Sequence, residues 1–258
     1  MRSKRGQVML FIIVALVIVA LAIFFFFIRK PGKSKPSEAL SPEAYLQDCI
    51  NLELEPAVEK LASQGGYLEL GNCIFYRNVC RHYLCYTTMP YKACVNQEPL
   101  LKEKIESILK EKLQQENVVK NCINNFAKAA KKDGYEVSTC QEHGLEPSFS
   151  VILEKGRISF PVNCTITLKK VQEIKFENFD LNLRWPLYEF VVLAKEIINE
   201  EITNTDFDPV AYMLRHYWVE IEKFRTSDDS KIYTLRDRNS KKEFVFAVRN
   251  YVLSPGVM

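Results

Sequence analysis

A long uncharged run near the N-terminus constrains this chain more than any other feature. The run covers residues 8–28 and is flanked by Arg2, Lys4 and Arg5 before it and by Arg29 and Lys30 after it. As a helix, these 21 residues extend about 31 Å, which matches the hydrocarbon core of a bilayer. The apolar part of a secretory signal is shorter, about 7–15 residues, and no Ala-x-Ala site follows this run. We therefore predict a transmembrane helix over residues 7–28.

The residues before this run form a pattern that suggests processing. A basic leader, residues 1–6, ends in Gly6, and the polar Gln7 opens the apolar segment. This arrangement resembles the signal of type IV pilin-like proteins, in the class III form carried by archaeal surface proteins. The resemblance implies that a prepilin peptidase cleaves between Gly6 and Gln7. An uncleaved anchor is the alternative.

Two features depart from the pilin pattern. Bacterial pilins usually carry a glutamate at the fifth mature position, where this chain has Phe11. A pilin stem also continues as a long helix beyond the membrane, whereas Pro31, Gly32 and Pro36 interrupt a helix here. Residues 29–41 are therefore expected to be a linker, and a tethered domain over 42–258 is favoured over a filament subunit.

The cysteines indicate on which side of the membrane the domain lies, because the basic flanks of the apolar run are too similar to decide. Eight cysteines follow the run: Cys49, Cys73, Cys80, Cys85, Cys94, Cys122, Cys140 and Cys164. An even number confined to one side favours disulfides in an oxidising exterior. The sequon Asn163-Cys164-Thr165, a candidate glycosylation site, points the same way. We expect an extracytoplasmic domain.

One disulfide can be predicted from helix faces. Cys49 lies on the apolar side of a helix predicted over residues 42–63, and Cys122 lies on the apolar side of a long polar helix predicted over 100–131. The two helices can pack with these faces together, so we predict that Cys49 and Cys122 form a bridge.

The remaining patterns predict an α+β fold with an antiparallel sheet and several packed helices. The clearest strand is 158–168, where apolar and polar residues alternate strictly. This register exposes Asn163 and buries Cys164. A helix over 186–201 and three strands at 217–224, 232–236 and 244–252 follow. Residues 42–140 and 141–258 are possible subdomains.

The search for catalytic chemistry finds no phosphate-binding loop, nucleophile elbow or metalloprotease motif. The one local group that could bind a metal is Cys80, His82 and Cys85, since thiolates and imidazole suit zinc. Its spacing is not that of a regular zinc knuckle, and disulfides are the favoured alternative. The acids Glu196, Glu200 and Glu201 are expected on the solvated face of their helix. We therefore expect no catalytic residue, no cofactor and no enzymatic activity.

Charge narrows the partners. The formal net charge is +3, and several of the positive charges flank the apolar run. A nearly neutral folded part argues against nucleic acid, and the basic flanks are expected to contact the lipid bilayer. The chain is predicted to be a single-pass, membrane-anchored, outward-facing surface protein with a non-enzymatic binding or structural role and other envelope proteins as candidate partners. The alternatives are a pilin-like filament subunit and a membrane-tethered enzyme or zinc-binding domain.

Overall fold

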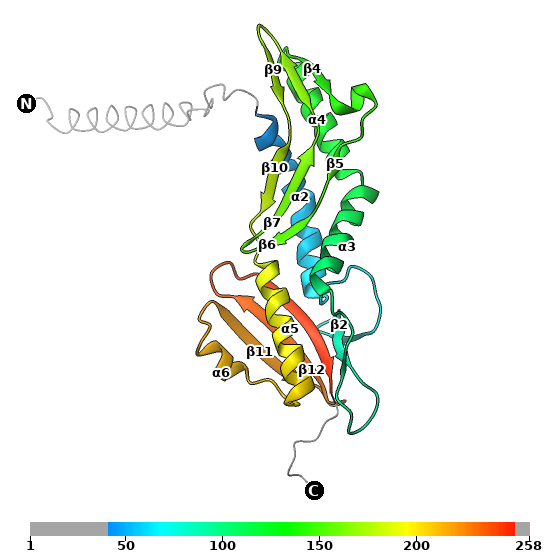
Figure 1. Cartoon of the computed structure of the whole chain (residues 1–258), viewed down its shortest axis with the longest axis vertical. Coiled ribbons are helices and arrows are strands. Elements are labelled where there is room, and N and C mark those ends of the chain that lie inside the picture. Colours follow the sequence, from blue (N-terminus) through cyan, green and yellow to red (C-terminus); the bar gives the residue numbers. More distant parts are fainter. Residues whose placement is uncertain (1–40, 251–258) are drawn as a thin grey trace, which may run out of the picture. The chain divides into compact units, whose positions relative to one another are not determined.

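The computed structural model describes residues 41–250 of the chain. The described residues from Pro42 onward belong to one compact unit, which is the folded domain (Figure 1). The predicted leader, the processing site at Gly6 and Gln7, and the transmembrane helix predicted over 7–28 lie outside the described residues. Within residues 41–250, no helix is both long enough and apolar enough to cross a bilayer.

The largest sheet has six strands, and it corrects the fold class predicted from the sequence. Its order is β1–β2–β13–β12–β11, and β3 also pairs with β2, at Cys85 and Tyr86. The strands are β1 (Cys73–Tyr76), β2 (Val79–Tyr86), β3 (Val95–Asn96), β11 (Val219–Arg225), β12 (Ser230–Asp237) and β13 (Glu243–Arg249). β13 and β2 run parallel, whereas the other pairs are antiparallel. The fold is α+β with a mixed sheet, so the expectation of an antiparallel sheet was wrong.

Two smaller antiparallel sheets complete the strands. The four-stranded sheet has the order β10–β7–β5, with β6 also paired to β7, and the three-stranded sheet has the order β4–β8–β9. Their strands are β4 (Glu136–Thr139), β5 (Ser148–Phe149), β6 (Ile152–Glu154), β7 (Arg157–Asn163), β8 (Ile166–Lys169), β9 (Glu173–Phe176) and β10 (Phe179–Leu183).

The alternating segment predicted as one strand is divided between these sheets. β7 ends at Asn163 and β8 begins at Ile166, so Cys164 and Thr165 form the passage from one sheet to the other. The alternation of burial nevertheless continues across the break: Cys164 is 2% exposed, and Asn163 is exposed. The prediction for both side chains is confirmed, because burial follows the side-chain period even where the hydrogen-bonded ladder stops.

Pro161 lies in β7, which is a central strand of the four-stranded sheet. β10 pairs on one side of it, with Asp180 opposite Pro161. On the other side, the partner is interrupted between β5 and β6, where Ser150 still donates its N–H to the Pro161 carbonyl at 3.3 Å. Proline has no N–H to continue a ladder, which explains the interruption.

The helices are α2 (Pro42–Ser63), α3 (Leu101–Gln115), α4 (Val118–Lys132), α5 (Leu187–Thr203) and α6 (Pro209–Met213), with a short 3-10 turn at Cys140–His143. α2 continues through Pro56 and ends in a Schellman arrangement, in which Gly66 donates its N–H to the Leu61 carbonyl at 2.9 Å. The single long helix predicted over 100–131 is two helices. The chain breaks at Asn117, whose φ of +52° is left-handed.

α2 joins the parts of the domain, since it contacts α4, β10 of the four-stranded sheet and β13 of the six-stranded sheet (Figure 1). It buries one face through Leu46, Ile50, Leu54, Val58 and Leu61. The β2–β13 pair also connects residues 42–140 with 141–258, the two segments that the sequence offered as subdomains. Contacts of α2 and the β2–β13 pair therefore connect the two segments into one domain.

Candidate functional site

All eight cysteines are paired, which confirms the expectation of disulfides. The bonds are Cys49–Cys122, Cys73–Cys80, Cys85–Cys94 and Cys140–Cys164. Cys49 and Cys122 connect α2 to α4 with their Cα atoms 5.9 Å apart, as the helix faces predicted. The other three bonds each close a local segment of the strand-rich part.

The metal site considered around Cys80, His82 and Cys85 does not form. Both sulfurs are in disulfides with other cysteines, so neither can act as a thiolate ligand. Among residues 41–250, no group of three or more potential ligands is close enough to hold a metal ion.

His82 instead fastens the segment that follows α2. Its Nε2 lies 2.8 Å from the Glu69 carbonyl oxygen, and its ring stacks on Tyr67 with centroids 3.9 Å apart. Gly71 packs so closely that a Cβ there would lie 2.9 Å from the His82 ring. Burial lowers the pKa of His82 below the usual 6.5 and favours the neutral ring, which donates to Glu69. The contacts give His82 a structural role.

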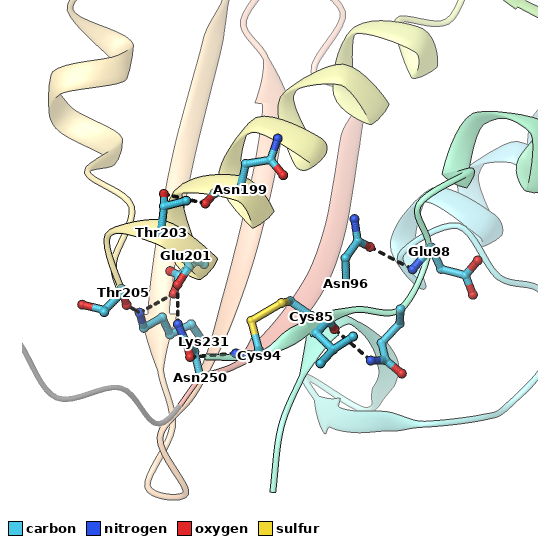
Figure 2. Close-up of a disulfide and its surroundings, with 12 residues drawn as sticks. Cys85, Cys94, Asn96, Glu98, Asn199, Glu201, Thr203, Thr205, Lys231 and Asn250 are labelled. Atoms are coloured by element: carbon cyan, nitrogen blue, oxygen red, sulfur yellow. Dashed lines mark hydrogen bonds and ion pairs between the residues drawn. A yellow bond between two sulfur atoms is a disulfide. The ribbon is translucent and has the colours of Figure 1, made fainter. Parts of the chain in front are cut away.

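The expectation that the acidic residues of α5 are all solvated is wrong for Glu201. Its side chain is completely buried, and its Oε2 lies 2.7 Å from Nζ of the buried Lys231 (Figure 2). Tyr233 donates its hydroxyl to the other carboxylate oxygen. Lys231 also donates to Asp206 at 2.6 Å and to the Thr205 carbonyl at 3.0 Å. All three ammonium protons therefore have acceptors.

This buried network reaches one disulfide. Asn250 donates its side-chain amide to the Glu201 carbonyl, and its Oδ1 accepts the Cys94 N–H at 3.1 Å (Figure 2). Burial would raise the pKa of Asp206, but hydrogen bonds from Lys231 and Lys223 outweigh it and keep that pKa below its usual value. The buried polar groups of this network all hydrogen-bond to other groups of the protein. The network therefore stabilises the fold and leaves none of these buried groups free for a ligand.

The acidic residues Glu196, Glu200 and Asp208 make hydrogen bonds at the surface of the domain. Tyr212 donates its hydroxyl to Glu196 at 2.9 Å, and burial together with this carboxylate raises the pKa of Tyr212 to about 12. Glu200 accepts a hydrogen bond from Asn204. Asp208 caps α6 by accepting hydrogen bonds from the N–H groups of Val210 and Ala211.

A cavity of about 540 Å³ lies between α2, α3 and the segment after α2, and is lined by Lys60, Tyr67, Glu69, Lys104, Ile108 and Lys112, among others. Two of its three lysines are paired, Lys104 with Glu98 and Lys112 with Glu116. Lys104 also lies 4.0 Å from the centroid of the Tyr67 ring. Lys104 and Lys112 thus each have a carboxylate partner just outside the lining of this cavity.

A second cavity, of about 520 Å³, has a different character, and we refer to it as the indole cavity. Its wall is built from the β6–β7 turn at Lys155 and Gly156, the segment 184–186, Glu189 in the first turn of α5, Trp218 just before β11, and the β12–β13 turn at Asp237 and Ser240. Its volume lies in the range of small-molecule sites, about 300–1,000 Å³.

Local sequence explains how this wall forms. β10 ends at Leu183, and Pro186 directly precedes α5 and fixes the entry into the helix. Trp185 is held in that short connection with 1% of its surface exposed. Phe190, one turn into α5, lies between the two tryptophans, with ring centroids 5.8 Å from Trp185 and 5.9 Å from Trp218.

Two buried polar atoms in this wall are unpartnered. The indole Nε1 of Trp185 and the Oε2 of Glu189 have no hydrogen-bond partner among the residues that the structure describes. A buried donor or acceptor without a partner is uncommon in folded proteins and calls for an explanation such as a ligand or an ordered water. Both belong to residues that line the indole cavity, but the two atoms themselves are enclosed by protein and are not part of its accessible surface.

Sequence reasoning missed this site. The available signal was that the chain has only two tryptophans, Trp185 and Trp218, and that Trp185 lies two residues before the start of a helix. Their proximity could not be deduced, because they come from segments on either side of α5 and α6.

Comparisons with known proteins give no further guide. No family model, no curated protein and no solved structure matches this chain significantly.

Proposed function

We propose that this chain is a membrane-anchored, outward-facing surface protein whose folded domain has a non-enzymatic binding role, with the indole cavity as the binding site. One observation carries the binding role: a cavity of about 520 Å³ has the partly exposed Trp218 in its wall, together with charged side chains such as Arg184 and Glu189. A cavity of this size, with an aromatic side chain and a few polar groups in its wall, is typical of small-molecule sites.

The outward placement is supported by the disulfides. Four disulfides account for every cysteine. Such a set persists in an oxidising compartment and is rare in a reducing cytosol. The apolar run at residues 8–28 and its basic flanks support attachment to a membrane.

The hydrogen bonds of the buried polar groups favour a binding role over catalysis. The buried Glu201, Lys231 and Tyr233 hydrogen-bond one another, and His82 is bound to a backbone carbonyl. A general acid or base has to reach a substrate proton, and these groups are directed at other protein atoms.

Protease treatment of intact cells tests the placement. An outward-facing domain is digested without lysis, whereas a domain on the cytoplasmic side is digested only after lysis. Protection in intact cells, with a cytoplasmic marker also intact, would contradict the proposal. N-terminal sequencing of the extracted protein tests the pilin-like signal: processing gives Gln7 as the first residue, and Gly6→Val blocks it.

A further inference from the structure

We infer that the open edge of β9 is a surface on which a second copy of this chain pairs, strand against strand. The inference goes beyond the proposed function and does not use the indole cavity. Three observations carry it. The main chain of β9 is uncovered on one side, its charges are complementary to those of its own antiparallel copy, and an apolar row of the sheet ends at this edge.

The main chain of β9 is open on the side away from β8. β9 is the last strand of the three-stranded sheet and pairs only with β8 (Figure 1). In the four-stranded sheet, by contrast, helices cap both edges. Gln47 of α2 hydrogen-bonds to the N–H and the carbonyl of Asn182 in β10, at 2.9 and 2.7 Å. Glu106 of α3 accepts the Leu153 N–H of β6 at 2.7 Å. Among residues 41–250, no side chain caps β9 in this way, and an uncapped edge is a template for another strand.

The side chains of β9 favour one particular pairing with a second copy. A two-fold axis brings the same surface of both copies together, which two antiparallel strands can satisfy. When Ile174 faces Ile174 of the second copy, Glu173 lies opposite Lys175 of that copy, and Lys175 lies opposite its Glu173. Opposite charges directly across a strand pair are stabilising, so each dimer gains this contact twice.

The other simple pairings of β9 with itself are unfavourable. A shift of two residues in one direction places Glu173 opposite Glu173, and the same shift in the other direction places Lys175 opposite Lys175. A shift of one residue places the charged face of one strand beside the apolar face of the other. A parallel pairing in register sets every charge opposite itself. Of these arrangements, only the antiparallel pairing about Ile174 brings opposite charges together.

An apolar row of the three-stranded sheet ends at the open edge. Val137 of β4, Leu168 of β8 and Ile174 of β9 lie opposite one another in the sheet. The first two are buried, and α4 packs against β4, whereas Ile174 at the edge is 48% exposed. A second copy paired at β9 continues this row with its own Ile174 and removes both side chains from water, which is favourable.

The charged row on the other face of the sheet continues in the same way. Glu136, Lys169 and Glu173 lie opposite one another on the three strands, and Lys169 Nζ is 3.3 Å from Glu136 Oε2. Lys175 of the second copy adds a cation beside Glu173, so the signs alternate across the junction. Within its own chain, Lys175 pairs only with the exposed Glu177 next to it.

Exchange of the two charges tests this pairing. The full chain is purified in detergent and its self-association is measured by sedimentation up to about 0.1 mM, because a short strand pair gives a weak dimer. We expect a monomer–dimer equilibrium that Glu173→Lys and Lys175→Glu each weaken at least tenfold. The double variant restores the complementary charges and should return to within threefold of the original affinity. The control is Glu136→Lys, the same charge change on the opposite edge of the sheet, which should leave the dimer intact.

Cysteine cross-linking tests the register in the membrane. All eight cysteines are in disulfides, so Ile174→Cys adds a single free thiol. In the inferred pairing this thiol faces its own copy across the strands, within reach of a disulfide after a small adjustment. Mild oxidation of membranes that contain the full chain should give a product of twice the mass of the chain. Val171→Cys is the control: this position is more exposed, but in the inferred pairing it lies about 20 Å from its copy.

The outcomes decide between the second copy and other partners. A chain that stays monomeric up to about 0.1 mM, and whose Ile174→Cys variant gives no cross-linked product, overturns the inference. So does a dimer that neither charge reversal weakens. Loss of the dimer in both single variants without recovery in the double variant overturns the pairing about Ile174, as does equal cross-linking at Val171. A product that joins Ile174→Cys to a different protein overturns the second copy as the partner. None of these results bears on the indole cavity, so the proposed function is tested separately.

Discussion

Nζ of Lys231 lies 2.7 Å from Oε2 of Glu201 in the interior of the domain, where the two side chains are 4% and 0% exposed. One residue comes from the last part of α5 and the other from β12, so the pair connects a helix to the central strands of the six-stranded sheet. Taking two charges out of water is costly, and the full set of hydrogen bonds around them offsets that cost.

The first prediction concerns the removal of one partner. Glu201→Ala leaves the Lys231 ammonium buried with only the partly exposed Asp206 as a charged partner, and we expect a loss of about 3–5 kcal/mol in the free energy of unfolding. Chemical denaturation of the purified protein measures it. The control is Glu116→Ala, which breaks the exposed pair with Lys112 and is expected to cost about 0.5 kcal/mol or less.

A double variant sharpens this test. Replacing both partners by apolar residues, Glu201→Leu with Lys231→Met, removes the unpaired charge and should recover much of the loss. If the double variant is no more stable than Glu201→Ala, the uncompensated charge is not the cause.

The second prediction is a pH dependence from His82. Because burial holds its pKa below 6.5, the folded state binds fewer protons than the unfolded state between that lowered pKa and about pH 6.5. The contribution of His82 to stability is therefore complete above about pH 6.5 and is lost as the pH falls through the folded pKa. Asp206, whose pKa is lowered from 3.8, acts only at more acidic pH.

Denaturation curves from pH 7.5 to 4.5 check this expectation. His82→Gln should flatten the slope of stability against pH below about pH 6.5, whereas His216→Gln, which alters a ring stacked on Tyr212, should retain it. A slope that is unchanged in His82→Gln would assign the pH dependence to another group.

Local sequence patterns predicted which faces of the helices and strands are buried, and this part of the prediction was largely correct. The alternation that exposes Asn163 and buries Cys164 holds, although the segment belongs to two sheets. Burial depends on a side chain's position along its own element, which a periodic pattern records directly. The pairing of β2 with β13 involves strands more than 150 residues apart, and no local pattern specifies it.

Glu201 shows where residue type misled the interpretation. It follows Ala194 and Ile198 by seven and three residues, so helical spacing places it on the buried face of α5. Its charge argued for the solvated face, and only the distant Lys231 and Tyr233 make burial favourable. The break at Asn117 was missed for a related reason: asparagine tolerates left-handed backbone, but it gives a weaker signal than glycine or proline.

The third prediction concerns glycosylation. Asn163 is the only asparagine in a sequon, it is exposed, and it lies at the end of β7 where the ladder stops. In a host that glycosylates asparagine, an outward-facing chain should carry one glycan, and Asn163→Gln should remove the corresponding mass. Asn182→Gln, at an exposed asparagine outside a sequon, is the control. A glycan that persists in Asn163→Gln would contradict the assignment.

The last prediction compares two disulfides of different reach. The Cys49–Cys122 bond closes a loop of 73 residues and fastens α2 to α4, whereas Cys73–Cys80 closes a loop of only 7 residues within one hairpin. In the chain-entropy account the long loop stabilises by about 4 kcal/mol and the short one by about 2 kcal/mol, because a longer loop removes more freedom from the unfolded chain. Replacing Cys49 and Cys122 together by serine should therefore lower the free energy of unfolding by about 2 kcal/mol more than the same change at Cys73 and Cys80. Denaturation of both double variants, with the remaining disulfides verified by peptide mapping, measures the difference. Equal losses would show that the bond between the helices acts mainly through the native contacts around it.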